Sequence, residues 1–305
     1  MMYDVTVIGG GPAGMAAALG AVSAGVRKVL LLERDNHLGG VLNQCTHTGF
    51  GLRYFKANLT GTEYARRFEK LVDASNIEVL KATTVLKITK DRKLLLSGAK
   101  LITAKSVVLA SGCRERPVGA LPIAGARPSG VIMAGAAQRM INLGGYAIGS
   151  LVVILGSGDV GMIVARDLKK RGTNVVAVVE QREFCGGLAR NKAQCLDAFK
   201  IPLMLTSTIT EIHGGGRITG VTIKNLSTGT ETFMPCDTLI ISVGLIPERE
   251  LLEDVAGING SSPDFLFVCG NAQFVHDMVD DVTEESWQTG RLAAEFALLP
   301  SREVV

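Results

Sequence analysis

The chain has 305 residues, of which 47% are hydrophobic and 20% are charged, and it carries a formal net charge of +3. This length and apolar content provide for one large domain or two ordinary domains, and they exclude a largely disordered chain. Because the charges nearly balance, composition alone gives no sign of a nucleic-acid or membrane-surface partner.

The first 40 residues have the pattern of a dinucleotide-binding unit. Residues 3–8 predict a buried strand, the sequence Gly-Gly-Gly-Pro-Ala-Gly follows over 9–14, and an alanine-rich helix runs to about Ala24. A second strand over 29–32 leads into Glu33, 19 residues beyond the last glycine of the turn. In such units the first glycine makes the turn, the second admits a pyrophosphate and the third brings helix and strand together, while the acid binds an adenosine ribose.

Further along, short alternating segments predict a three-stranded meander over 83–89, 94–97 and 101–103. An apolar strand over 107–109 then ends in the small residues Ala110-Ser111-Gly112. We expect this last strand to return to the sheet and close the first unit.

The same pattern returns 147 residues later. A strand over 151–155, the turn Gly-Ser-Gly-Asp-Val-Gly over 156–161 and a helix to about Arg171 precede a strand over 175–179. Glu180 follows, again 19 residues beyond the last glycine of the turn. A lone glycine turn is weak evidence, but two copies in register predict two dinucleotide sites. The aligned pairs include Gly9 with Gly156, Gly14 with Gly161, Glu33 with Glu180 and Gly40 with Gly187.

The second unit also contains a meander, predicted over 206–213, 218–224 and 230–234, and an apolar strand that ends before Gly244. Between corresponding glycines this unit is 15 residues shorter than the first. We assign the surplus of the first unit to the segment 43–62, which is rich in Gly, Thr and Asn.

The last part of the chain predicts one more strand over 265–269, followed by Gly270-Asn271. A final helix is predicted over 283–298. Asp281 is its expected N-cap, and Glu284 has the spacing of a capping box.

The repeat predicts an α/β fold with two Rossmann-like domains, each with a β-meander crossover. The segments 114–117 and 247–248 have the composition of crossings between domains. We therefore divide the chain into 1–116, 117–246 and 247–305, with the second domain inserted in the first.

Other classes of protein are not favoured. Two uncharged runs, 5–26 and 140–158, are long enough to cross a bilayer, but they are glycine-rich and contain the nucleotide-type turns, so we expect no membrane span. Asp4 interrupts the N-terminus, which argues against a secretory signal. The six cysteines form no CxxC pair, so we expect reduced thiols in a cytoplasmic protein and no metal site.

Two such units in this order resemble the two-dinucleotide-binding flavoproteins of the pyridine nucleotide–disulfide oxidoreductase superfamily, over essentially the whole chain. The resemblance implies FAD in the domain formed by 1–116 and 247–305, and NAD(P)H in the domain 117–246. The late FAD motif of that family reads Gly-Asp, whereas this chain has Gly270-Asn271, whose amide can also bind hydroxyl groups. The final helix would point its N-terminus at the flavin N1–O2 edge.

The resemblance also implies site residues. A carboxylate at Glu180 would accept a hydrogen bond from the ribose 2′-hydroxyl and repel a 2′-phosphate, which favours NADH, although Arg182 leaves NADPH open. The residues implied for FAD are Gly9, Gly11, Pro12, Ala13, Gly14, Glu33, Arg34, Gly40, Val41, Ala110, Ser111, Gly112, Gly270, Asn271, Val282 and Thr283. The residues implied for the nicotinamide nucleotide are Gly156, Gly158, Asp159, Val160, Gly161, Glu180 and Gly244.

Four segments, 39–51, 111–117, 185–191 and 269–277, are similar to those of a group of FAD-dependent NAD(P)H oxidoreductases that are related to the B chain of anaerobic glycerol-3-phosphate dehydrogenase. That resemblance implies electron transfer with a protein partner that has its own flavin or iron–sulfur centre. Thioredoxin reductases are of similar size, but they need a CxxC pair that this chain lacks, and the CxxxxC of glutathione reductases is absent too. We therefore expect no dithiol relay.

Hydride transfer between nicotinamide C4 and flavin N5 needs no protein acid or base, so candidate catalytic side chains are few. Cys45 is either a flavin-adjacent redox thiol or a small packed residue. His47 is either a proton donor beside it or a loop histidine bound to backbone.

The sequence therefore predicts an FAD-dependent oxidoreductase that transfers hydride between NAD(P)H, with NADH favoured, and FAD. It would exchange electrons with a partner or small acceptor as one component of a glycerol-3-phosphate dehydrogenase-like complex. One alternative is an NADH oxidase or peroxide reductase that uses Cys45, and another is a non-enzymatic redox-sensing or scaffold protein. The acceptor, the direction of flux and the oligomeric state, including a homo-oligomer, are left open.

Overall fold

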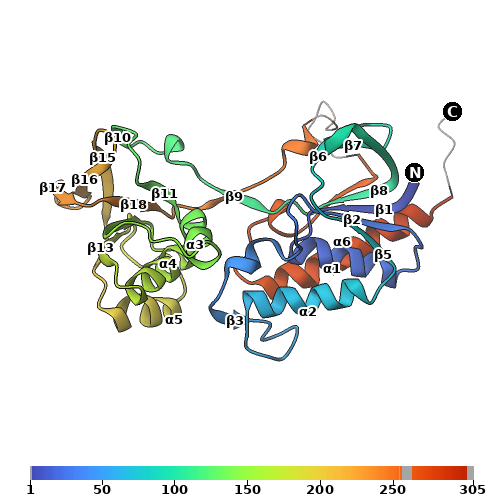
Figure 1. The fold of residues 1–305 in the computed structure, drawn as a ribbon, viewed down its shortest axis with the longest axis horizontal. Helices are drawn as coiled ribbons and strands as arrows, with labels where there is room; N and C mark the ends of the chain where they lie inside the picture. Colours follow the sequence, from blue (N-terminus) through green and yellow to red (C-terminus); the bar gives the residue numbers. More distant parts are fainter. Residues whose placement is uncertain (1, 254, 256–262, 301–305) are drawn as a thin grey trace. The chain divides into compact units, whose positions relative to one another are not determined.

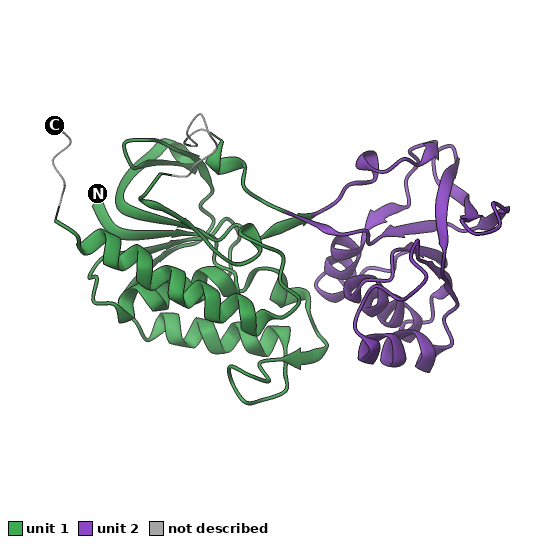
Figure 2. Cartoon of the chain, turned by 180° about the vertical axis from the view of Figure 1, so that it is seen from behind, with its two compact units in different colours: residues 1–114, 247–305 green, residues 115–246 purple. Residues whose placement is uncertain are grey.

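A computed structural model describes residues 2–253, 255 and 263–300 (Figure 1). Parallel sheets with helices packed against them form two compact units, which are coloured separately in Figure 2. Each unit has its own hydrophobic cores, so each is described by itself. Within the described residues, no helix combines the length and the apolar character needed to cross a membrane.

The second unit is a continuous insertion into the first. Unit 1 comprises residues 1–114 and 247–305, and unit 2 comprises residues 115–246. The chain leaves unit 1 within β9 (Cys113–Glu115) and returns within β19 (Leu245–Pro247). These two short strands pair with each other.

Unit 1 is built on a seven-stranded sheet in which β7 pairs antiparallel with both of its neighbours and the other pairs are parallel. β1 pairs with β2 up to Ile8 and Leu32, so both strands end at the same edge, where Gly9 and Glu33 follow. The order is β5-β2-β1-β8-β7-β6, with β20 also beside β8. The strands are β1 (Met2–Ile8), β2 (Val29–Leu32), β5 (Ile77–Leu80), β6 (Val85–Ile88), β7 (Lys93–Leu96), β8 (Lys100–Leu109) and β20 (Leu266–Val268).

Three helices lie side by side against this sheet: α1 (Pro12–Ser23), α2 (Gly61–Asp73) and α6 (Val279–Leu298) (Figure 1). Glycines allow α1 and α6 to approach closely. A Cβ atom added to Gly20 would collide with the carbonyl oxygen of Trp287. The alanine-rich sequence of α1 therefore serves close packing, and it fixes the start of α1 beneath the end of β1.

The segment 43–62 begins in η1 (Gly40–Gln44), forms a hairpin of β3 (Thr48–Phe50) and β4 (Leu59–Thr60), and ends in the first turn of α2. Its aromatic side chains pack on α2, with the Phe55 ring centroid 5.0 Å from that of Tyr64. α2 begins with a capping box, because Thr60 and Glu63 exchange hydrogen bonds between side chain and backbone. The surplus of the first unit is thus a structured element of unit 1.

Unit 2 contains two sheets. A five-stranded parallel sheet packs against α3 (Ala134–Asn142) and α4 (Asp159–Lys170), and a four-stranded sheet holds the predicted meander. A three-residue helix, α5 (Ala189–Asn191), follows β13. The parallel sheet has the order β11 (Val131–Met133), β18 (Thr238–Ile241), β12 (Leu151–Leu155), β13 (Asn174–Val179) and β14 (Leu203–Met204). The other sheet has the order β10 (Ala124–Gly125), β15 (Ser207–Gly214), β16 (Ile218–Asn225) and β17 (Glu231–Pro235).

The predicted α/β class with Rossmann-type units is confirmed, but the first meander needs a correction. The segments predicted as separate strands over 101–103 and 107–109 form one strand, β8. Its first part pairs with β7 and its later part with β1, so hydrogen-bond partners are present along its whole length. Ala104 and Ser106 are both buried, and the alternation therefore continues between the two predicted strands.

The predicted start of the final helix is also wrong. α6 begins at Val279 with Met278 as its N-cap, four residues before the predicted start. Asp281 is therefore not the N-cap, and Glu284 completes no capping box. Asp280 and Asp281 lie in the first turn, where carboxylates stabilise the positive end of a helix.

Candidate dinucleotide sites

The glycine turn of unit 1 connects β1 to α1 and leaves one side open. A Cβ atom on Gly9, whose φ is +106°, would collide with the carbonyl oxygen of Ala110, and one on Gly14 would collide with that of Gly9. A Cβ atom on Gly11 would meet nothing closer than Gly40 Cα at 4.0 Å. The first and third glycines are therefore required by packing, whereas the second leaves space for a ligand beside the backbone.

The turn of unit 2 repeats this arrangement between β12 and α4. A Cβ atom on Gly156, whose φ is +100°, would collide with the carbonyl oxygen of Ser242. On Gly161 it would lie 2.7 Å from the Gly156 oxygen, and on Gly158 it would meet nothing within 4 Å. The structure thus gives each unit the same cradle at the N-terminus of a helix, where anions bind favourably.

The two predicted ribose acids are held in the same way. Glu33 is 7% exposed, and its carboxylate accepts hydrogen bonds from Gly10 N (2.6 Å) and Asp35 N (2.7 Å). Glu180 is 8% exposed, and its carboxylate accepts from Ser157 N (3.0 Å) and Arg182 N (3.0 Å). The donors of the two units are related by the same offset of 147 residues as the acids.

The carboxylate of Glu180 is stabilised in its charged form. Burial acts to raise the pKa of Glu180, but hydrogen bonds from Ser157 and Arg182 outweigh it, and the pKa lies below the ordinary glutamate value. One of these donors is the Ser157 hydroxyl, 2.6 Å from Glu180 Oε2. Ser157 is not among the predicted site residues, and its one signal in the sequence is that it aligns with Gly10, which has no side chain.

The late motif lies against the glycine turn of unit 1. A Cβ atom on Gly270 would lie 2.6 Å from Ala13 Cβ and 3.3 Å from Val282 Cγ1. Gly270 N donates to Glu285 Oε2 (2.9 Å), a residue that sequence reasoning did not single out. The structure therefore brings together predicted residues from the start, the middle and the end of the chain: Gly9, Gly11, Ala13, Gly14, Gly40, Ala110, Gly270 and Val282.

Asn271 is part of a polar chain beside this motif. Its Oδ1 accepts from His276 N (3.0 Å), and its Nδ2 lies 3.7 Å from Cys113 Sγ. His276 Nε2 lies 3.6 Å from Glu285 Oε2. Burial raises the pKa of Glu285, although the Gly270 N–H and His276 act to lower it.

Three other predicted residues, Ser111, Arg34 and Thr283, contact residues outside the glycine turns. Ser111 Oγ donates to the carbonyl oxygen of Glu248, and Arg34 lies 3.8 Å from the Glu248 carboxylate. Thr283 is buried and shares a hydrogen bond of 2.7 Å with Tyr64 Oη. Pro12 starts α1, Val41 is exposed, Gly112 and Gly244 have positive φ, and Asp159 and Val160 start α4.

The two predicted catalytic side chains have different surroundings. Cys45 is 9% exposed and its Sγ lies 3.4 Å from the carbonyl oxygen of Val41. A Cβ atom on Gly61 would meet Cys45 Cβ, so the thiol packs at the start of α2. His47 is half-buried, and its ring lies 5.0 Å from that of Phe50. A catalytic role for either residue stays a prediction.

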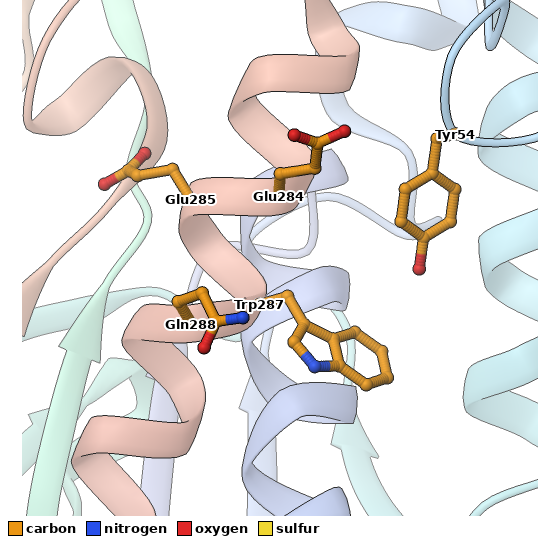
Figure 3. Close-up of a pocket in the computed structure, with 5 residues that line it drawn as sticks. All are labelled: Tyr54, Glu284, Glu285, Trp287 and Gln288. Atoms are coloured by element: carbon orange, nitrogen blue, oxygen red, sulfur yellow. The ribbon is translucent and has the colours of Figure 1, made fainter.

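A surface hollow of about 590 Å³ lies beside α6 and is lined by Tyr54, Glu284, Glu285, Trp287 and Gln288 (Figure 3). In Figure 3 the rings of Tyr54 and Trp287 lie on the same side of α6 as Glu284. Burial, helped by the charge of Glu284, raises the pKa of Tyr54. The lining includes no residue of either glycine turn.

Two glycine cradles, each with a hydrogen-bonded acid at the end of the neighbouring strand, define a Rossmann-type protein with two dinucleotide sites. The family model of the pyridine nucleotide-disulphide oxidoreductases matches residues 3–268. The chain therefore belongs to the pyridine nucleotide-disulphide oxidoreductase family. Membership makes it an oxidoreductase of the class that uses FAD and NAD(P)H.

The curated relatives have low sequence identity to this chain and are longer than it. The F subunit of alkyl hydroperoxide reductase from Staphylococcus aureus (strain MSSA476) is 25% identical over 302 residues, which cover 93% of this chain and 54% of that protein. The alpha subunit of sarcosine oxidase from Rhizobium meliloti (strain 1021) is 33% identical over 245 residues, covering 73% of this chain and 24% of that protein. The chain thus spans about half the length of the reductase relative and about a quarter of the oxidase relative.

Solved structures share the fold over nearly the whole chain. Lactococcus lactis thioredoxin reductase has a TM-score of 0.79 and 23% identity, covering 97% of this chain and 99% of that one. Thioredoxin reductase of T. acidophilum has a TM-score of 0.74 and 21% identity, covering 97% of each chain. All six cysteines of this chain are described, and none of them forms a disulfide bond.

The residues present fit both cofactors of the family. Each cradle leaves backbone accessible at its second glycine, as a pyrophosphate requires. Each acid accepts hydrogen bonds from the loop and keeps at least one acceptor position for a ribose hydroxyl, since a carboxylate has about four. Assignment of FAD to unit 1 and of NAD(P)H to unit 2 follows the order of the resemblance and stays a prediction.

Proposed function

We propose that the chain transfers hydride between NADH and FAD and exchanges the electrons with a protein partner. Unit 1 would hold FAD, and unit 2 would hold NADH. The observation that supports this most is the pair of equivalent sites, in which an open glycine cradle and a buried, hydrogen-bonded acid recur at an offset of 147 residues. One site would serve a resident cofactor and the other an exchanging substrate.

The residues of the chain would bind and orient. Bound FAD and NADH supply the hydride chemistry, which requires no side-chain acid or base. The backbone at Gly11 and Gly158 would face the pyrophosphates, and Glu33 and Glu180 would accept from ribose hydroxyls. Gly270 would bring the late motif against the start of α1, close to the same cofactor as Gly11.

The choice of NADH over NADPH is supported by charge. The pKa of Glu180 is lowered, so its carboxylate is ionised at neutral pH and would repel a 2′-phosphate. Arg182, the alternative phosphate ligand, donates its backbone N–H to the Glu180 carboxylate. Its guanidinium lies over the Phe184 ring, 5.8 Å from the centroid.

A protein partner is supported by the curated relatives, both of which are named as subunits of larger enzymes. We propose a partner with its own flavin or iron–sulfur centre, in a complex of the glycerol-3-phosphate dehydrogenase type. This finer part of the proposal rests on the sequence of the segments 39–51, 111–117, 185–191 and 269–277.

The test is an anaerobic titration of the purified, flavin-loaded protein with NADH and, separately, with NADPH, followed by the flavin absorbance. Rapid bleaching by NADH and slow bleaching by NADPH is the expected result. Bound flavin that neither nucleotide reduces would contradict the proposal and would favour the scaffold alternative. Bleaching by NADPH alone would contradict the nucleotide choice but not the hydride transfer.

A further inference from the structure

The two glycine turns differ at one position that matters for the acid. The residue after the first glycine is Gly10 in unit 1 and Ser157 in unit 2. Both residues donate their backbone N–H to the acid of their unit. Only Ser157 adds a side chain, and this side chain is fully buried.

The Ser157 hydroxyl joins two parts of the nucleotide site. It donates to Glu180 Oε2 (2.6 Å) and accepts from Gly186 N (2.7 Å). A Cβ atom on Gly186 would lie 3.4 Å from both Glu180 Oε2 and Ser157 Oγ, so Gly186 sits directly against the pair. One hydroxyl group therefore fixes the Glu180 carboxylate and the segment that covers it.

This contact changes how many acceptor positions the acid retains. A carboxylate has about four positions for hydrogen-bond donors. Glu33 uses two of them for protein donors, whereas Glu180 uses three. Glu180 thus retains about one position, and its orientation is fixed more firmly than that of Glu33.

We propose that Ser157 is a positioning residue for nucleotide choice: its hydroxyl holds the Glu180 carboxylate where it accepts from a ribose 2′-hydroxyl and repels a 2′-phosphate. This inference rests on the proposed binding of NADH in unit 2. Without the hydroxyl, Glu180 keeps only its two backbone donors and is held less firmly, and Gly186 loses its acceptor. Both changes weaken NADH binding and reduce discrimination against the 2′-phosphate.

The test measures binding, not turnover. Titration calorimetry with NAD⁺ and with NADP⁺ is carried out on flavin-loaded wild type, Ser157→Ala and Ser157→Gly. Glycine reproduces the residue that the equivalent turn of unit 1 accommodates. We expect the dissociation constant of NADP⁺ divided by that of NAD⁺ to fall about tenfold in both variants. This is the size expected when one hydrogen bond to a charged group is lost.

A double-mutant cycle shows whether Ser157 acts through the acid. In a Glu180→Gln background, Ser157→Ala should change the ratio by less than about twofold, because the charge that it positions is gone. Ser207→Ala is the matched control, since this buried hydroxyl of unit 2 bonds to the carbonyl oxygen of Leu205. It should leave the ratio at the wild-type value.

Two failures are distinguishable. If wild type binds neither nucleotide, the proposed function is wrong. If wild type prefers NAD⁺ and Ser157→Ala keeps the full preference, the role of Ser157 is wrong. An equal loss of preference with Glu and with Gln at 180 would also overturn it, because Ser157 would then act through the loop and not through the carboxylate.

Discussion

At the scale of single residues, Glu180 shows how a buried carboxylate keeps its charge. Burial disfavours the ionised form, and three donors from Ser157 and Arg182 more than compensate. Because the pKa is lower in the folded than in the unfolded chain, the folded chain binds fewer protons to this group. The stabilisation is therefore present above about pH 4.3, the ordinary glutamate value, and is lost as pH falls through the folded pKa.

The lowered pKa of Glu180 gives a prediction for the stability of Glu180→Gln. Wild type should be more stable than the variant at about pH 7, and the difference should shrink as the pH falls below about 4.3. Urea unfolding followed by circular dichroism at a series of pH values measures it. A difference that stays constant over the whole range would show that the carboxyl pKa is not lowered in the folded chain.

Cys45 tests the peroxide-reducing alternative. Its thiol is packed and directed at the carbonyl oxygen of Val41, so Cys45→Ser should change NADH-dependent flavin reduction by less than about twofold. Stopped-flow bleaching, with and without added peroxide, measures this. Cys236→Ser is the matched control, since burial raises the pKa of that thiol to about 11. Loss of peroxide turnover in Cys45→Ser alone would favour the alternative.

At the scale of elements, the local sequence pattern was enough to predict those strands, turns and helices whose structure depends on neighbouring residues. The strand, turn, helix and acid of each unit follow from glycine geometry and apolar periodicity, and α1 and α4 end within two residues of the prediction. The start of α6 and the continuity of β8 depend on partners far away in the sequence. The Gly270–Ala13 approach and the Ser157–Glu180 bond also join distant residues, so spacing could suggest the site but not these contacts.

The first turns of α1 and α4 differ in charge, and this difference predicts a difference in affinity. α4 begins with Asp159, whereas α1 begins with Pro12. A carboxylate stabilises a helix N-terminus but repels a pyrophosphate placed there. Asp159→Asn keeps an acceptor for Leu188 N, which Asp159 Oδ1 binds at 2.8 Å, and removes the charge.

We expect Asp159→Asn to bind NAD⁺ about three- to tenfold more tightly at low salt, with a smaller gain at high salt. Calorimetry at two ionic strengths measures this. Asp197→Asn removes the same charge from an exposed position of unit 2 and should leave the affinity unchanged. An unaltered affinity in Asp159→Asn would mean that the carboxylate does not face the bound nucleotide.

At the scale of the whole molecule, two units with separate cores should lose their ligands independently. The third glycine of each turn offers a matched pair of variants. A Cβ atom at Gly14 collides with the Gly9 carbonyl oxygen, and one at Gly161 comes within 2.7 Å of the Gly156 oxygen. Neither glycine can be replaced unless the start of its helix moves.

Gly14→Ala should reduce the flavin content of the purified protein at least about tenfold, and Gly161→Ala should weaken NAD⁺ binding by a similar factor while flavin is retained. Absorbance and calorimetry give the two readouts. Gly119→Ala is the control, because its Cβ atom meets nothing within 4 Å. Flavin loss in Gly161→Ala but not in Gly14→Ala would reverse the assignment of the units.

The matched hydrogen bonds of the two acids have a consequence for the origin of the chain. Not only the glycines but also the donors to Glu33 and Glu180 correspond at one constant offset. Duplication of an ancestral gene segment accounts for both sets of matches at once. The two halves then descend from one ancestral sequence. Positions such as 10 and 157 are where the two copies came to differ as they acquired separate tasks.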